Sequence, residues 1–276
     1  MSALLTEALG GLAAVGLDEL NARAELLTRV DRKYLVPVTA AVDGLEAMRG
    51  TARALDFGAA RSPRYSSVYF DTPDRLSYRL AAQARRRRFK VRTRCYEDTG
   101  TAYLEMKTKG GRGATVKERM EIDPGDVARL TGAGGAYVSE ALETIGYDPG
   151  LRDALRPALV TRYRRATLLL PDDSRATVDT DLEWIDPMGR SLTLPGFTIL
   201  ESKSAGRASA VDRWLWRRGI RPQSISKFGT GLAALHPELP GNKWHRLIEG
   251  PFAQAPRVSP APSTRRLPIH RSTRTS

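Results

Sequence analysis

The stretch RRRRFKVRTRCY, residues 85–96, holds seven cations among its first ten positions, and three of them recur at every second position. Side chains two residues apart on a β-strand share one face, so Lys90, Arg92 and Arg94 line up on one side of an expected strand. Such a row suits phosphate, because an Arg fork binds two phosphate oxygens and Lys acts as a compact charge. The row predicts either a solvated face, which is the usual meaning of strand charges, or an anion-binding face.

The same spacing occurs on five further candidate strands. They group Asp31 with Lys33, Glu105 with Lys107 and Lys109, Lys117 with Arg119 and Glu121, Arg175 with Thr177 and Asp179, and Glu201 with Lys203. The alternate positions of these strands are apolar, as at Leu104, Met106, Val178 and Leu200. Six charged stripes backed by apolar residues weaken the solvated-face interpretation, because helices could cover the apolar faces and leave the charged faces turned inward.

The remaining pattern predicts an α+β chain. Eight short segments rich in Val, Thr, Tyr or Leu are typical of strands, and short links favour an antiparallel meander. The candidate strands are KYLVPV, YSSVYFDT, RFKVRTRCY, TAYLEMKTK, ATVKERMEI, LVTRYRRATLLL, SRATVDTDLEW and FTILESK. Helices are expected at residues 17–29, 39–52, 124–145 and 208–218. About eight strands can close into a barrel that holds side chains or one ligand, so we expect a closed antiparallel eight-stranded β-barrel with flanking helices.

Inward-facing cations would need compensation. Two cations about 6 Å apart repel by about 3 kcal/mol at an effective dielectric constant near 20. The carboxylates of Glu105, Glu121, Asp179 and Glu201 could supply part of the compensation, and a polyanionic ligand the rest.

Composition narrows the class of protein. The chain has 276 residues and a formal net charge of +13, and its last 26 residues carry five arginines and no acid. Without those five the charge is still +8, so the expected folded part favours anionic partners. We expect an N-terminal helical segment at residues 1–28, a domain at 29–250 and a disordered basic tail at 251–276. A single cysteine and three histidines exclude a disulfide framework and argue against a His/Cys metal cage.

The sequence shows no targeting peptide and no apolar run long enough for a membrane span. A soluble cytoplasmic protein is therefore expected, and the sequence does not indicate its oligomeric state.

Several segments, taken in order, carry a resemblance to a known family. They are DRKYLVP, YSSVYFDTP, FKVRTRCY, LEMKTK, VKERMEI, RATVDTDL, ILESK and SKFGTG, which lie between residues 31 and 231. Together they resemble the catalytic domain of the vacuolar transporter chaperone (VTC) family, polyphosphate polymerases of the CYTH-like triphosphate tunnel metalloenzyme superfamily. The resemblance implies a β-barrel tunnel in which the γ-phosphate of ATP is added to inorganic polyphosphate with Mn²⁺ or Mg²⁺.

The resemblance also implies roles for particular residues. Catalytic cations would be Lys33, Arg92, Arg94, Lys107, Arg165, Arg175, Lys203 and Lys227. Further phosphate-binding residues would be Lys90, Lys109, Lys117, Arg119 and Ser226. Glu201, in LESK, matches the metal-binding glutamate. Arg165 is chosen over Arg162 and Arg164 because of its offset from the tyrosine in TRYRRA.

Two departures from related patterns bear on the activity. Tunnel enzymes that hydrolyse triphosphate carry Glu-x-Glu-x-Lys on their first strand, whereas this chain has Arg29, Asp31 and Lys33, which favours a polymerase. Before SKF, Gln223–Ile225 lacks the lysine expected in the polymerases. The alternatives are a triphosphatase acting on inorganic triphosphate or an RNA 5′ end, and a non-catalytic module that binds polyanions. We expect ATP and polyphosphate as partners, and not nucleic acid as a specific one.

Overall fold

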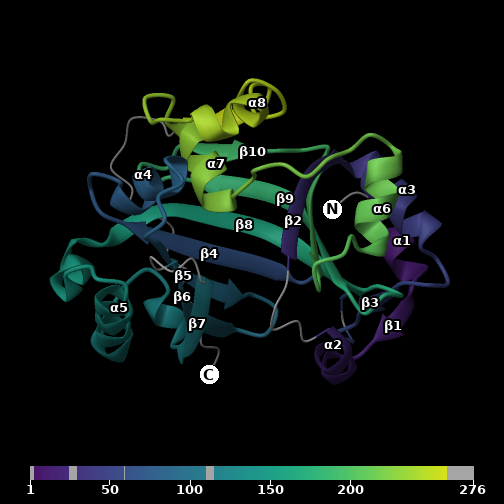
Figure 1. Ribbon diagram of the computed structural model, residues 1–276, viewed down its shortest axis with the longest axis horizontal. Coiled ribbons are helices and arrows are strands. Elements are labelled where there is room, and N and C mark those ends of the chain that lie inside the picture. Colours follow the sequence, from purple (N-terminus) through teal and green to yellow (C-terminus); the bar gives the residue numbers. More distant parts are fainter. Residues whose placement is uncertain (1–2, 25–29, 59, 110–114, 260–276) are drawn as a thin grey trace, which may run out of the picture. The chain divides into compact units, whose positions relative to one another are not determined.

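The computed structural model describes residues 3–24, 30–58, 60–109 and 115–259. The chain forms two compact units, each assembled from separate stretches of sequence (Figure 1). The first unit comprises Met1–Arg64, Tyr163–Leu182 and Leu194–Ile225, and the second comprises Tyr65–Arg162, Glu183–Thr193 and Ser226–Ser276. None of the helices in the described ranges has the length and apolar character needed to cross a membrane.

The elements divide between the units as follows. The first unit holds α1 (Ala3–Gly10), β1 (Ala13–Val15), α2 (Leu17–Ala24), β2 (Val30–Pro37), α3 (Val38–Ala47), β3 (Arg53–Leu55), β11 (Phe197–Ser204) and α6 (Ala210–Arg217). The second unit holds α4 (Leu76–Ala82), β5 (Arg88–Tyr96), β6 (Thr101–Lys109), β7 (Thr115–Ile122), α5 (Gly132–Thr144), β10 (Ser191–Thr193), α7 (Lys227–Leu235), α8 (His245–Ile248) and β12 (Arg257–Val258). It also holds three 3₁₀ helices, Pro124–Asp126, Pro149–Ala154 and Asn242–Trp244. Three strands contribute residues to both units: β4 (Arg64–Asp71), β8 (Arg156–Leu169) and β9 (Arg175–Ile185).

All eight strands predicted from the sequence are present, but the predicted closed eight-stranded barrel is wrong. Twelve strands form the sheet, and within the described residues its order β12-β10-β9-β8-β4-β5-β6-β7 does not close on itself. The four additional strands, β1, β3, β10 and β12, have two or three residues each, too few for a hydrophobic pattern. In addition, β9 changes partner: Arg175–Asp179 pairs with β11, and Glu183–Ile185 pairs with β10. Asp181, between these stretches, has a φ of 50°, so the strand is irregular there.

The predicted helices are confirmed within shorter limits. Helices α2, α5 and α6 lie inside their predicted ranges, and α3 begins one residue before its predicted range and ends within it. Residues 25–29, the end of the first of these ranges, lie outside the described residues, as do the link at 110–114 between two predicted strands and residues 260–276 of the expected tail. The described start of that tail is ordered, because Phe252 is fully buried and β12 pairs with β10.

The first unit buries the apolar side of an antiparallel sheet under helices. In its register Tyr34 of β2 lies opposite Leu200 of β11, and Leu200 lies opposite Val178 of β9. These side chains share a core with residues of α1, α3 and α6, among them Leu5, Leu45 and Trp214. Figure 1 shows these three helices together beside β2. Because side chains alternate along a strand, the neighbouring charged residues must lie on the other face of this sheet.

The second unit repeats this arrangement with the meander β4-β5-β6-β7. The apolar positions of these strands, including Phe70, Val91 and Met106, form a core with Val138 and Leu142 of α5. Helices therefore cover the apolar strand faces in both units, as expected from the sequence. Because side chains alternate along a strand, the charged stripes lie on the opposite face in each unit.

Helix α7 begins where Ser226 accepts a hydrogen bond from the backbone of Gly229 at 3.2 Å. A Cβ atom at Gly229 would lie 2.3 Å from Trp244, and one at Gly231 would lie 2.1 Å from Trp184. Trp184 also donates to the carbonyl oxygen of Lys227 at 2.8 Å. The two glycines thus allow two tryptophans to pack directly against the helix backbone, which fixes the position of Ser226 and Lys227.

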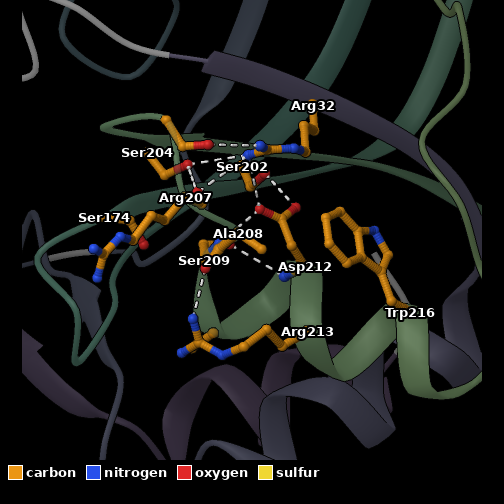
Figure 2. A network of polar contacts seen from close by, with 12 residues as sticks. Arg32, Ser174, Ser202, Ser204, Arg207, Ala208, Ser209, Asp212, Arg213 and Trp216 are labelled. Atoms are coloured by element: carbon orange, nitrogen blue, oxygen red, sulfur yellow. Dashed lines mark hydrogen bonds and ion pairs between the residues drawn. The ribbon is translucent and has the colours of Figure 1, made fainter.

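Asp212 joins α6 to the apolar side of the first unit's sheet (Figure 2). Its Oδ1 accepts hydrogen bonds from the hydroxyls of Tyr34 and Ser202, both at 2.6 Å. Its Oδ2 accepts from the backbone N–H of Ser209 at 2.8 Å and contacts Arg32 at 3.3 Å, completing a capping box at the start of the helix. One fully buried carboxylate therefore holds β2, β11 and α6 together.

We expect Asp212→Asn to lower the free energy of unfolding by about 3 kcal/mol, because the new amide nitrogen cannot accept these bonds and Arg32 loses its counter-ion. Urea denaturation monitored by circular dichroism measures the change. As a control, Asp153→Asn removes an exposed carboxylate that pairs with Arg152, and should cost less than about 1 kcal/mol. Equal losses in the two variants would contradict the anchoring role of Asp212.

Candidate functional site

Glu105 lies at the centre of the second unit's charged face. Its Oε2 accepts from the Nε and Nη2 atoms of Arg92 at 2.8 and 2.5 Å. Its Oε1 lies 3.5 Å from Nη1 of Arg94 and 3.4 Å from Nζ of Lys117. The strand register explains the cluster, because Arg92 is directly opposite Glu105 and Arg94 is two residues along the same face. Three cations thus share one carboxylate that is only 3% exposed.

The charge of this cluster fixes the ionisation of Glu105. Burial alone would raise its pKa, but the positive charges of Arg92, Arg94 and Lys117 outweigh burial and hold the pKa well below its usual range. Glu105 is therefore a permanent anion that still leaves a surplus of positive charge around it.

A row of lysines crosses the same face. Lys90 of β5 lies opposite Lys107 of β6, and Lys107 lies opposite Lys117 of β7. Like charges directly opposite one another destabilise a sheet, so this row is unfavourable without an anion. Lys90 donates to Ser226 Oγ at 3.0 Å, which brings the first turn of α7 to the row.

The other proposed phosphate-binding residues of the second unit surround these groups. Arg119 of β7 lies opposite Glu105 with its guanidinium 4.9 Å from the Tyr103 ring centre, and Lys109 ends β6 opposite Arg88. Lys227 is the first residue of α7. Glu121, expected to compensate cations, is exposed and forms no ion pair within the described part of the chain.

Glu201 is the central carboxylate of the first unit's charged face. Its Oε1 lies 3.1 Å from Nζ of Lys33, directly opposite on β2, and 3.9 Å from Nζ of Lys203. Burial opposes ionisation of Glu201, yet the charges of Lys203, Lys33 and Arg165 hold its pKa well below the usual range. The closest contact of each ion pair is made at Oε1.

Two arginines complete this face. Arg165 forms a bidentate pair with Asp179, with N–O distances of 2.6 and 2.7 Å. Arg175 lies opposite Lys203 in the register, but it donates to Asn21 Oδ1 at 3.1 Å, so its guanidinium contacts α2. Asp31 also lies opposite Lys203, whereas Arg29 is outside the described residues.

The structure tests whether these residues suit a divalent metal. The described ranges contain no group of three or more His, Cys, Asp or Glu side chains that could form a complete metal cage. Magnesium and manganese in phosphate sites need only one or two protein carboxylates, because phosphates and water supply the other oxygens. Glu201 fits this requirement with its ionised carboxylate. Glu105 fits it poorly, since cations contact both of its oxygens.

Aromatic residues on the charged faces were not among the sequence predictions. Tyr69 accepts a hydrogen bond from Nη1 of Arg92 at 3.1 Å, and Tyr65 lies 5.9 Å from the Arg94 guanidinium. Both belong to YSSVYFDT, where period-two spacing already places Tyr65, Ser67 and Tyr69 on one face. That spacing was the available signal, and the missing information was which strand lies next to β5.

Glu105→Gln keeps the side-chain shape but removes its charge, so we expect a loss of about 3 kcal/mol in the free energy of unfolding near neutral pH. A lowered folded-state pKa gives a contribution that is fully present above the ordinary carboxyl pKa of about 4.3 and lost as the pH falls through the lower folded value. The gap between variant and wild type should therefore narrow below about pH 4.

Urea denaturation of both proteins from neutral to acidic pH measures this gap. Glu118→Gln, which changes an exposed carboxylate on the same strand pair, serves as the control and should cost less than about 1 kcal/mol at neutral pH. A gap for Glu105→Gln that stays constant with pH would refute the electrostatic explanation.

Comparison with known proteins places the chain in a family. Residues 28–236 match the VTC domain family, and a search of curated proteins found no match. Among solved structures, a proposed adenylate cyclase from Bacillus halodurans is 14% identical, with a TM-score of 0.48, covering 72% of this chain and 94% of that one. A proposed adenylyl cyclase from Hippeastrum, described as having a dominant triphosphatase activity, is 16% identical, with a TM-score of 0.47, covering 75% and 96%.

Both TM-scores lie below 0.5, so the assignment depends on the family match, which spans most of the sequence and contains both charged faces. The chain belongs to the VTC domain family.

Proposed function

We propose that this protein is an ATP-dependent polyphosphate polymerase that transfers the γ-phosphate of ATP to the end of an inorganic polyphosphate chain. The observation that carries the proposal is the surplus of cations around Glu105, where Arg92, Arg94 and Lys117 share one buried anion. A protein gains nothing in stability from such a surplus, whereas a polyphosphate substrate would neutralise it. Membership in the VTC domain family supports the same substrate class.

The reaction we propose needs little covalent chemistry from the protein. A terminal oxygen of the polyphosphate attacks the γ-phosphorus, the bond to the β-phosphate oxygen breaks, and ADP leaves. Phosphoryl transfer is accelerated mainly by in-line positioning and by cations around the transferring group. Among the described residues, Arg92 and Arg94 can donate to phosphoryl oxygens, and the lysine row of Lys90, Lys107 and Lys117 can bind further phosphates.

The charged face of the first unit offers a metal ligand and a second group of cations. We propose that Glu201 holds Mn²⁺ or Mg²⁺ through its carboxylate, and that Lys33, Lys203, Arg165 and Arg175 contribute positive charge on the same face. When bound, the metal would neutralise charge on the phosphates and orient them. Lys227 and Ser226, at the start of α7, and Lys109 and Arg119 complete the proposed phosphate-binding set. We expect the enzyme to act in the cytoplasm, where ATP is available.

The sequence around the start of β2 favours polymerisation over hydrolysis. A two-metal hydrolase would need a second carboxylate on this strand, and Arg29 occupies the expected position in the sequence. The decisive experiment incubates the purified protein with ATP and Mn²⁺ and separates long polyphosphate from free phosphate by electrophoresis. We expect long polyphosphate. Free phosphate alone would indicate a triphosphatase, and no turnover despite tight binding would indicate a polyanion-binding module.

Glu201→Gln should reduce the turnover number by roughly 100-fold or more, because the amide cannot replace an anionic metal ligand. Binding of inorganic triphosphate measured without metal should not weaken, since a negative charge is lost from a phosphate-binding face. Glu46→Gln, on the exposed side of α3, is the matched control and should keep wild-type turnover. Full activity of the Glu201 variant would exclude the metal assignment.

Arg92→Ala should lower kcat/KM by roughly 100-fold, because it removes a bidentate donor from a largely buried position. Arg85→Ala removes an exposed charge from the same arginine-rich segment, so it should change mainly the salt dependence of binding. Steady-state kinetics at low and high ionic strength separates the two effects. Small and equal changes in both variants would favour the solvated-face interpretation.

A further inference from the structure

Two neighbouring polar groups in the second unit are buried and have no hydrogen-bond partner among the described residues. The hydroxyl of Ser67 on β4 is one, and the Nε atom of Arg94 on β5 is the other. Ser67 is 1% exposed and the Arg94 side chain is 8% exposed. The two residues lie directly opposite one another in the β4–β5 register, so their side chains share the charged face.

Such a pair is energetically unfavourable in the ligand-free chain. Most buried polar groups are hydrogen-bonded, and each donor left without a partner costs about 1–3 kcal/mol. Glu105 also binds Arg94 less closely than Arg92, because its contact with Arg94 Nη1 is 3.5 Å long, whereas Arg92 binds the same carboxylate at 2.5 Å. Arg94 thus retains a donor that Glu105 does not satisfy.

The chemistry of the two groups indicates what could satisfy them. Arg94 Nε–H can only donate, and the Ser67 hydroxyl can donate as well. A single acceptor between them would accept both bonds, and the surplus positive charge of Arg92, Arg94 and Lys117 around Glu105 favours an acceptor that carries negative charge. A phosphoryl oxygen meets both conditions, whereas a water molecule meets only the first.

We propose that Ser67 and Arg94 together bind one oxygen of a phosphoryl group, so that Ser67 is a phosphate-binding residue. The identity of the ligand rests on the proposed function, while the pairing of the two donors rests on the structure. The adjacent Ser66 lies opposite Cys95 with its side chain on the other face, and it provides a matched serine that cannot reach this oxygen.

The experiment compares Ser67→Ala and Ser66→Ala with wild type in two measurements. Calorimetric titration with inorganic triphosphate gives the affinity, and thermal unfolding gives the ligand-free stability. Ser67→Ala should weaken triphosphate binding about tenfold, the effect of losing a hydrogen bond to a charged group. Its ligand-free melting temperature should stay the same or rise, because the variant removes a buried hydroxyl that lacks a partner. Ser66→Ala should leave the affinity unchanged.

Arg94→Lys tests whether the two donors share one oxygen. Lysine keeps the charge but lacks the Nε–H group, so the single variant should also weaken binding. If both donors contact the same oxygen, the double variant Ser67→Ala/Arg94→Lys should lose less affinity than the product of the single losses. If the affinity loss of the double variant equals the product of the two single losses, the two donors do not contact the same oxygen.

Other outcomes would also overturn the inference. A Ser67→Ala variant that binds triphosphate like wild type would show that water satisfies the pair, and the proposed function would stand. A lower ligand-free melting temperature would show that Ser67 has a structural partner. Equal losses in Ser66→Ala and Ser67→Ala would show a general distortion of β4. If the wild-type protein itself fails to bind triphosphate, the proposed function fails and this inference fails with it.

Discussion

Repulsion among cations on the polar faces of the sheet is the constraint on which the other features depend. Lys90, Lys107 and Lys117 lie opposite one another on three adjacent strands. Arg92 and Arg94 lie further along the same face of β5. A sheet with this sequence folds only if something compensates the charges and something else supplies stability. Glu105 gives the compensation, and the apolar reverse side gives the stability.

The helices make that division possible. In the second unit α5 covers the side of the meander that carries Val91 and Met106, and in the first unit α1, α3 and α6 cover the side that carries Tyr34 and Leu200. Because alternation allows no intermediate positions, burying one set of side chains fixes the other set on the opposite face. Asp212 strengthens this arrangement, since its bonds to β2, β11 and α6 prevent the helix from shifting along the sheet.

The local alternation of apolar and charged residues was enough to predict the eight long strands and which residues share a face, because both follow from period-two spacing. It was not enough to predict strands of two or three residues, or the change of partner along β9, because those depend on contacts distant in sequence. The same limit applies to the site. The sequence indicated that Glu105 and Glu201 could compensate cations, but it could not show that Arg175 contacts Asn21 or that Arg165 pairs with Asp179.

The two central glutamates differ in a way that only coordinates reveal. Both have strongly lowered pKa values for the same physical reason, an excess of nearby cations. Cations contact both oxygens of Glu105, so it is already saturated as a counter-ion, and a further cation would have to displace an arginine or a lysine. Glu201 has only lysines as its ion-pair partners among the described residues, and both approach it at Oε1, so a metal ion bound at Oε2 would not have to displace an arginine. The same residue type thus serves as a counter-ion in one unit and as a candidate metal ligand in the other, and the strand register around each carboxylate determines which.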